Sequence, residues 1–128
     1  MTPVEKIIVK SLVAVAWADG TVAEPESGMI DSLLWAFGAS DDEENDVREF
    51  AKKKRTIKGD VVAKSLDRNA RELLLAHAAL LTHADGKQTP AEAKLLKSLA
   101  EHLEFSDDDT RRIIEGARDR AKKLSERV

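Results

Sequence analysis

Apolar residues recur at intervals of three and four along most of the chain, the spacing that places them on one face of an α-helix. Runs of β-branched residues are scarce, whereas alanine and leucine, which favour helices, are frequent. The apolar stripes fall in six segments, at about residues 3–18, 24–37, 41–55, 67–84, 90–103 and 107–126. The pattern therefore predicts an all-helical protein.

The ends of these segments carry residues that start and stop helices. Thr2-Pro3-Val4-Glu5, Ser40-Asp41-Asp42-Glu43 and Thr89-Pro90-Ala91-Glu92 have the composition of capping boxes, in which a hydroxyl and a carboxylate satisfy free amides of the first turn. Asp19-Gly20 and Asp85-Gly86 are expected to end the helices before them, because glycine readily adopts the left-handed conformation of a helix terminus.

The chain contains an internal repeat with an offset of 66 residues, which aligns residues 12–43 with residues 78–109 without a gap. Ala18-Asp19-Gly20 then falls on Ala84-Asp85-Gly86, and Glu26 falls on Glu92. Ser40-Asp41-Asp42 falls on Ser106-Asp107-Asp108 in the same alignment. Each half is therefore predicted to form a helix, an Asp-Gly turn, a second helix and a capped third helix.

We predict one domain over residues 1–128, with repeat one at about 3–55, repeat two at about 67–126 and a short connector at 56–66. Within the connector, Ile57–Asp60 is predicted to form a turn, and a short helix is predicted across Val61, Val62 and Leu66. Neither half can bury its apolar face alone. The two copies are therefore expected to pack about an approximate twofold axis, as the subunits of an isologous dimer do.

Composition excludes several classes of function. The net charge of −3 argues against a nucleic-acid-binding protein, which usually carries a basic surplus. The absence of cysteine excludes disulfides, thiolate nucleophiles and thiolate metal sites. No apolar stretch approaches the roughly 20 residues needed to span a bilayer, and the N-terminal residues lack the features of a signal peptide. We expect a cytoplasmic protein with no direct membrane insertion.

The paired motif Ala-Asp-Gly followed by Glu, in an all-helical chain of this length, resembles the TerB-like tellurite-resistance family, whose fold is shared by the N-terminal region of the DjlA membrane co-chaperones. The resemblance implies a compact bundle of about seven helices with pseudo-twofold symmetry. It also implies an acidic, metal-binding surface, formed by Asp19 and Glu26 in one copy and Asp85 and Glu92 in the other. Gln88 departs from the aliphatic residue that the family keeps two places after the glycine.

The motif carboxylates have two interpretations. Together they would offer hard oxygen ligands suited to Ca²⁺ or Mg²⁺. Alternatively, the glutamates only cap helices and the aspartates only mark turns. The motif is no EF-hand, because the places for that loop's earlier oxygen ligands hold Val15 and Trp17, and in the second copy Leu81 and His83.

Other candidate residues favour structural roles. His83 lies close to Asp85, but its counterpart in the first copy is Trp17. His77 and His102 have no partners at the spacing of zinc ligands. The basic run Lys52–Arg55 is expected to be a solvated helix end, and Trp17 and Trp35 are expected at the core or its edge.

These observations favour a non-enzymatic TerB-like domain with a divalent-cation site, acting indirectly in a tellurite or chemical-stress response. The alternative is a co-chaperone-like accessory module that binds a protein partner through its acidic turns and holds no metal. Catalysis is not expected, because no motif marks a nucleophile or a phosphate-binding loop. Both hypotheses include a protein partner and exclude nucleic acid.

Overall fold

The computed structural model of the chain describes residues 1–18, 31, 34–35, 37–53, 55–82 and 90–126, without the side chains at 81–82, 91–92 and 121–126. The described part contains six α-helices, one 3-10 helix and no strand. Their bounds are α1 Pro3–Ala18, α3 Asp41–Ala51, α4 Ile57–Asp60, η1 Ala63–Ser65, α5 Arg68–Thr82, α6 Pro90–His102 and α7 Asp107–Glu126. The prediction of an all-helical fold is confirmed.

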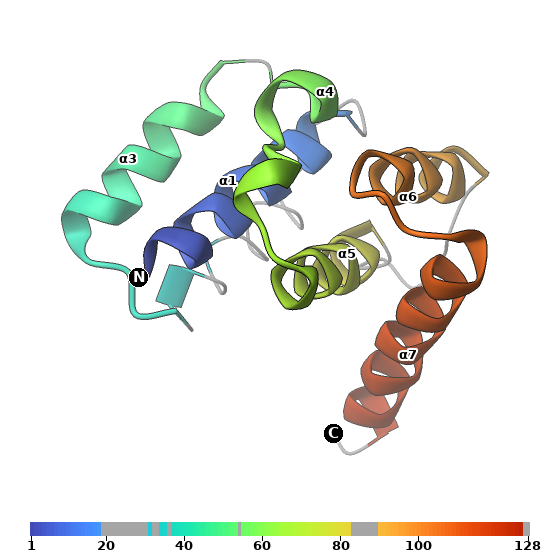
Figure 1. The fold of residues 1–128 in the computed structure, drawn as a ribbon. Coiled ribbons are helices and arrows are strands. Elements are labelled where there is room, and N and C mark those ends of the chain that lie inside the picture. Colours follow the sequence, from blue (N-terminus) through green and yellow to red (C-terminus); the bar gives the residue numbers. More distant parts are fainter. Residues whose placement is uncertain (19–30, 32–33, 36, 54, 83–89, 127–128) are drawn as a thin grey trace.

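The first helix, α1, lies at the centre of the bundle (Figure 1). It packs against α3, α4, α5 and α6, while α7 packs against α5. Because neighbours surround it, α1 is buried continuously from Ser11 to Ala16 and not only along one stripe. The Ser11 hydroxyl is buried with it and donates a hydrogen bond to the Ile7 carbonyl oxygen at 2.8 Å, which satisfies the only buried polar side chain of the described core.

Helix starts follow the predicted capping residues wherever the structure describes them. The Thr2 hydroxyl accepts from the Glu5 amide at 3.1 Å, and the Glu5 carboxylate accepts from the Thr2 amide at 2.8 Å. Ser40 and Glu43 form the same reciprocal pair at the start of α3. At the start of α7 the Ser106 hydroxyl accepts from the amide three residues later at 3.2 Å. Thr89 lies outside the described residues, although α6 begins directly after it.

The connector differs from its prediction. Ile57–Asp60 is one turn of α-helix, not an irregular turn, because the Thr56 hydroxyl accepts from the Gly59 amide and caps it. The helix predicted across Val61, Val62 and Leu66 is replaced by the 3-10 turn η1 at Ala63–Ser65. Val61 and Leu66 are still buried, so the apolar pattern identified the packed residues but not the type of turn.

Two helix C-termini have the same geometry 66 residues apart. Gly38 has φ 68° and donates to the Trp35 carbonyl oxygen at 3.1 Å, while the Ala39 amide donates to Leu34 at 2.9 Å. Glu104 has φ 66° and donates to the Glu101 carbonyl oxygen at 3.0 Å, and the next amide donates to that of Ala100 at 3.0 Å. This is the hydrogen-bond pattern of a left-handed helix cap. The first of these caps directly follows the apolar stripe at about residues 24–37.

The packing of α1 on α3 and of α5 on α7 also shares a contact at the 66-residue offset. The Lys6 ammonium lies 3.0 Å from the Asp46 carboxylate. At the equivalent positions the Arg112 guanidinium lies 3.0 Å from the Glu72 carboxylate, so the ion pair recurs with its charges exchanged. The full pseudo-twofold relation stays a prediction, because residues 19–30 and 83–89 are outside the description. No helix in the described part is both long and apolar enough to cross a membrane.

Candidate functional site

The four candidate metal ligands are only partly covered by the structure. Asp19, Glu26 and Asp85 lie outside the described residues. Glu92 belongs to the first turn of α6, but its side chain is outside the description. The structure therefore does not test whether the four carboxylates come together. It does describe α1, which precedes the first Asp-Gly motif, and α5 and α6, which precede and follow the second.

A groove lies where the C-terminal end of α1 meets α4 and α6. It has a volume of about 1150 Å³. Its lining includes Trp17 and Ala18 from the end of α1, Ile57 from α4, and Leu95 from α6. Ala18 directly precedes Asp19 in the chain, and Leu95 follows Glu92 by three residues, which is close to one helical turn. The groove therefore joins the described neighbours of a first-copy and a second-copy motif acid.

Trp17 is held at the inner wall of this groove. Its indole N–H donates to the Ala51 carbonyl oxygen at 2.9 Å, which ties the end of α1 to the end of α3. Val15, two residues earlier, is fully buried. Both side chains thus belong to the packed interior and its edge, as expected for positions that supply no metal ligand. The prediction for Trp17 is confirmed.

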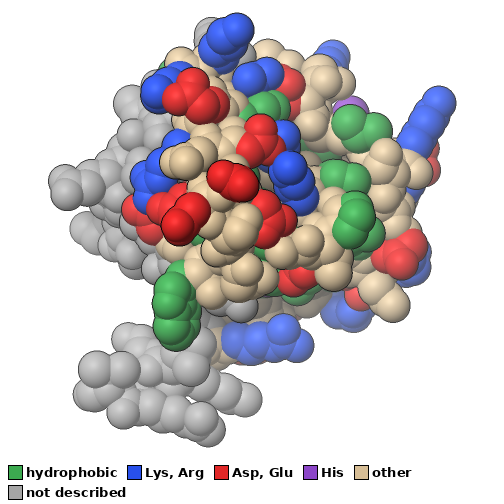
Figure 2. Space-filling view, turned by 90° about the vertical axis from the view of Figure 1, so that its left-hand side faces the viewer, with side chains coloured by type: hydrophobic (Ala, Val, Ile, Leu, Met, Phe, Trp, Pro, Cys, Tyr) green, Lys and Arg blue, Asp and Glu red, His purple; other side chains and the backbone are tan. Residues whose placement is uncertain are grey.

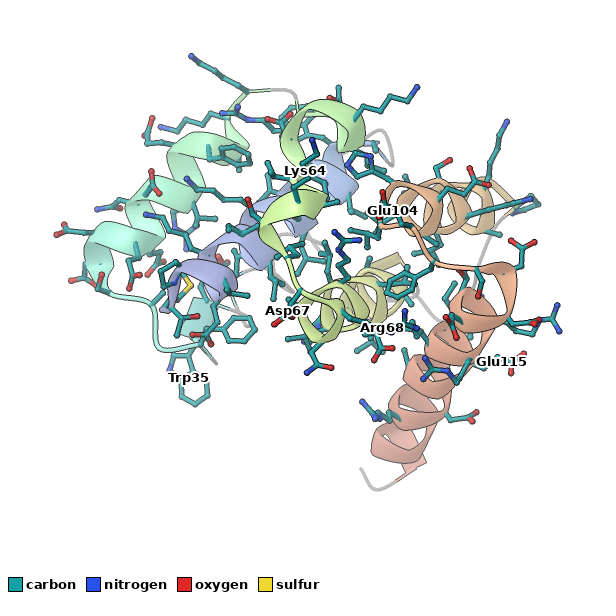
Figure 3. All side chains as sticks on the ribbon, in the orientation of Figure 1. Trp35, Lys64, Asp67, Arg68, Glu104 and Glu115 are labelled. Carbon is teal, nitrogen blue, oxygen red and sulfur yellow. The ribbon has the colours of Figure 1, made fainter. Side chains whose placement is uncertain are left out.

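The prediction for Trp35 is wrong. Its side chain is 87% exposed and points away from the bundle (Figure 3). The preceding residue, Leu34, fills the core position at only 3% exposure. Adjacent residues of a helix point in directions about 100° apart, so a helix at the edge of the bundle can bury Leu34 while Trp35 faces away. The prediction followed from residue type alone, because large aromatic residues are usually well buried.

Arg55 at the groove is a structural residue and not part of a solvated helix end. Its guanidinium stacks on the Phe50 ring with 3.7 Å between the guanidinium carbon and the ring centroid. Its Nε donates to the Phe50 carbonyl oxygen at 2.9 Å, and Asp60 lies 3.5 Å away. Lys52 and Lys53 are exposed at the end of α3, as expected. The prediction for the basic run thus holds for these two lysines, fails for Arg55 and is untested for Lys54, which is outside the description.

The described histidines bind the backbone. His102 lines the groove, and its Nε2 lies 2.6 Å from the Val61 carbonyl oxygen, so that nitrogen carries a proton and donates it. His77 Nδ1 lies 2.8 Å from the Leu73 carbonyl oxygen, one turn earlier in α5. These contacts agree with structural roles. His83 lies outside the described residues.

The first turns of α3 are rich in acidic residues, and Figure 2 shows red side chains interspersed with blue ones. Asp46 lies 3.0 Å from both the Lys6 and the Lys10 ammonium groups, whose hydrogen bonds hold the pKa of that carboxyl below its usual value. Arg48 lies within 2.9 Å of both Asp31 and Glu44. These acids are neutralised by neighbouring cations. Within the described ranges, no three His, Asp or Glu side chains are grouped so as to hold a metal ion.

Sequence reasoning missed one organising residue, Arg71. Its guanidinium donates to the carbonyl oxygens of Ala63 at 2.8 Å, Leu66 at 3.0 Å and Leu103 at 3.1 Å. It thereby joins η1, the start of α5 and the end of α6. No sequence signal marks this role, because an arginine four residues into a helix has the composition of an ordinary exposed position.

The helices and their repeated caps define a small all-α protein whose two halves share local contacts. The chain belongs to the family described as tellurite resistance protein TerB, whose family model matches residues 6–115. The match covers both Asp-Gly motifs and all four motif carboxylates. Comparison with curated proteins gives no match, and comparison with solved structures gives none either.

Proposed function

We propose that this chain is a non-enzymatic TerB-family domain that binds a divalent cation through its two acidic turns. The ligands in this proposal are Asp19, Glu26, Asp85 and Glu92, and the cation is Ca²⁺ or Mg²⁺, which prefer carboxylate oxygens. The two copies are proposed to pack about an approximate twofold axis in a seven-helix bundle. The seventh helix of this proposal is the one predicted at about residues 24–37. The domain would act in a tellurite or chemical-stress response.

The groove between α1, α4 and α6 is the observation that carries this proposal. Ala18 and Leu95 both line it, and they are the described neighbours of Asp19 and Glu92. The end of the helix before the first motif and a residue one turn after Glu92 therefore line the same groove, which supports the proposal that the motif acids lie near it. The family match, which spans both motifs, supports the same assignment.

Repulsion between the carboxylates of the two acidic turns would favour the binding of a cation. Two carboxylates about 4 Å apart repel by roughly 4 kcal/mol at an effective dielectric of 20. A bound divalent cation converts that repulsion into attraction and links the turns. The role in stress response would then be indirect, by sensing, scaffolding or recruiting, because the acidic turns repel an oxyanion such as tellurite.

Titration calorimetry with Ca²⁺, Mg²⁺ and Zn²⁺ tests the proposal. We expect saturable heat for at least one of the two hard cations, lost in an Asp19→Asn/Asp85→Asn variant. The matched control is Asp42→Asn/Asp108→Asn, which removes two exposed acids at another pair of positions 66 residues apart. Absence of heat with every cation, or equal heat from the Asp19→Asn/Asp85→Asn variant, would remove the cation site.

The second candidate is a protein-interaction module without metal, and the apolar part of the same groove favours it. Trp17, Ile57 and Leu95 give it an apolar lining, and its described charged residues are Arg55, Lys58 and Glu101. An apolar part of a peptide would occupy this groove, while basic residues of the same peptide would bind the acidic turns proposed beside it. Such a contact would be driven partly by charge, so a partner captured on the immobilised chain at low salt should be released at high salt. Capture that is insensitive to salt would contradict charge-driven docking.

A further inference from the structure

The groove between α5 and α7 has a filled counterpart in the first half of the chain. In that half Phe50 lies partly buried against the core, with the Lys10 ammonium 5.2 Å and the Arg55 guanidinium 3.7 Å from its ring centroid. At the 66-residue offset, Phe50 becomes Gly116 and Lys10 becomes Ala76. The two large side chains that fill the α1–α3 groove are therefore replaced by much smaller residues in the α5–α7 groove.

The result is a hollow of about 430 Å³, within the size range of sites that hold small ligands and large enough for one indole ring. Leu73, Ala76 and Ile113 contribute to its apolar lining, and Leu73 remains 40% exposed. A Cβ built on Gly116 meets no heavy atom within 4 Å, so space is open above the α7 backbone. Arg112 and Arg120 line the α7 side; Arg112 pairs with Glu72 of the α5 side at 3.0 Å, so the two arginines leave one positive charge in excess.

The same chain carries an exposed aromatic side chain suited to this hollow. Trp35 is 87% exposed and points outward (Figure 3). The segment that follows it reaches α5, since the Phe37 and His77 ring centroids are 6.3 Å apart. His77 in turn binds the carbonyl of Leu73, which lines the hollow. The segment that follows the exposed tryptophan thus packs on α5, which forms one wall of the hollow.

The residues around Trp35 and around the hollow also carry opposite charges. Asp31 lies four residues before Trp35, and both positions are helical; this spacing is the one that places two residues on one side of a helix. The Asp31 carboxylate is 50% exposed even though Arg48 contacts it. A tryptophan inserted between α5 and α7 would bring this carboxylate toward Arg112 and Arg120. The arrangement would repeat the first half of the chain, where a cation stacks on the aromatic ring that fills the groove.

We propose that the chain associates with a second copy of itself, with Trp35 of one copy inserted into the groove between α5 and α7 of the other. In an isologous dimer each subunit would contribute one tryptophan and one groove. This inference uses none of the four motif carboxylates and does not depend on cation binding.

Sedimentation analysis over a range of protein concentrations tests the proposal. We expect the wild-type chain to form dimers as concentration rises. Trp35→Ala should weaken the dimer by about thirtyfold or more, as is typical for truncating a central tryptophan of an interface. Gly116→Phe should also abolish dimers, because it restores the side chain that fills the groove in the first half. Gly116→Ala, which leaves most of the hollow open, and Val62→Ala, an exposed position on the connector, are the matched controls.

Mixing the two disrupted variants makes the test specific. Trp35→Ala retains an open groove and Gly116→Phe retains the tryptophan, so their mixture should recover heterodimers held by one intact contact. Circular dichroism checks that each variant keeps its helices. A wild-type chain that stays monomeric at every concentration overturns the proposal and leaves the groove for an aromatic side chain of another protein. Dimers that survive Gly116→Phe overturn it as well.

Discussion

Gly38 and Glu104 occupy equivalent left-handed positions, one served by glycine and one by glutamate. A side chain at such a position costs of the order of 1 kcal/mol or more, because its Cβ crowds the following carbonyl oxygen. Glu104 gains little in return, since its contact with Arg71 at 3.3 Å is made by a carboxylate that is 79% exposed. The helix cap at Glu104 is therefore less stable than the equivalent cap at Gly38.

Glu104→Gly is predicted to raise the free energy of unfolding by about 0.5–1 kcal/mol, because glycine removes the left-handed strain at some cost in chain entropy. Urea denaturation measures the change. Glu101→Gly, three residues earlier and helical, is the matched control and should lower stability by a similar amount. Loss of stability in both variants would contradict the account of this cap.

Arg71 stabilises the junction of η1, α5 and α6 through three backbone carbonyls. Arg71→Ala should lower the free energy of unfolding by about 2–4 kcal/mol, because partly buried acceptors lose their donors. Arg71→Lys should not restore it, since a single ammonium cannot reproduce the planar fork of donors. Denaturant titration of both variants checks this. Full stability of the lysine variant would contradict the proposed geometry.

At the scale of helices, the caps are also the acid-sensitive elements. The Ser40 amide donates to the Glu43 carboxylate, and with the Met1 ammonium it holds the pKa of Glu43 below its ordinary value of 4.5. The Thr2 amide lowers the pKa of Glu5 in the same way. A carboxyl whose pKa is lower in the folded state contributes stability above its unfolded pKa and loses it as pH falls through the folded value.

The unfolding free energy is therefore predicted to decline as the pH falls below 4.5, the ordinary glutamate value. Glu5→Gln/Glu43→Gln should be less stable than wild type at neutral pH and should show a shallower decline on acidification. Denaturant titrations at several pH values between neutrality and the folded pKa values measure both slopes. A double variant with the wild-type slope would show that these caps do not contribute to acid sensitivity.

The ends of the helices were more predictable than their environments. Thr2, Ser40 and Ser106 act locally, so their caps follow from residue type and spacing alone. The exposure of Trp35 and the tertiary hydrogen bonds of Arg71 depend on which neighbours the fold supplies, and periodicity does not specify these. The type of turn in the connector depended on one side-chain hydrogen bond, from the Gly59 amide to Thr56.

At the scale of the whole molecule, the described contacts relate the α1–α3 pair to the α5–α7 pair. The exchanged ion pairs Lys6–Asp46 and Glu72–Arg112 keep one packing geometry although the residues differ. Where Phe50 of the first copy is replaced by Gly116 in the second, the second copy has the open groove. The sequence repeat identified the candidate carboxylates, but distances between residues of different copies require coordinates. Whether the four acids meet therefore stays a prediction.

The most direct test of the central claim, that both acidic turns hold one cation, is a nuclear magnetic resonance titration of backbone amides with Ca²⁺. The account predicts that the amide signals of Gly20 and Gly86 shift together along one saturating curve, while those of the α3 and α7 caps at Ser40 and Ser106 stay unchanged. Signals at the two glycines that do not move, or that follow unrelated curves, would contradict a shared site.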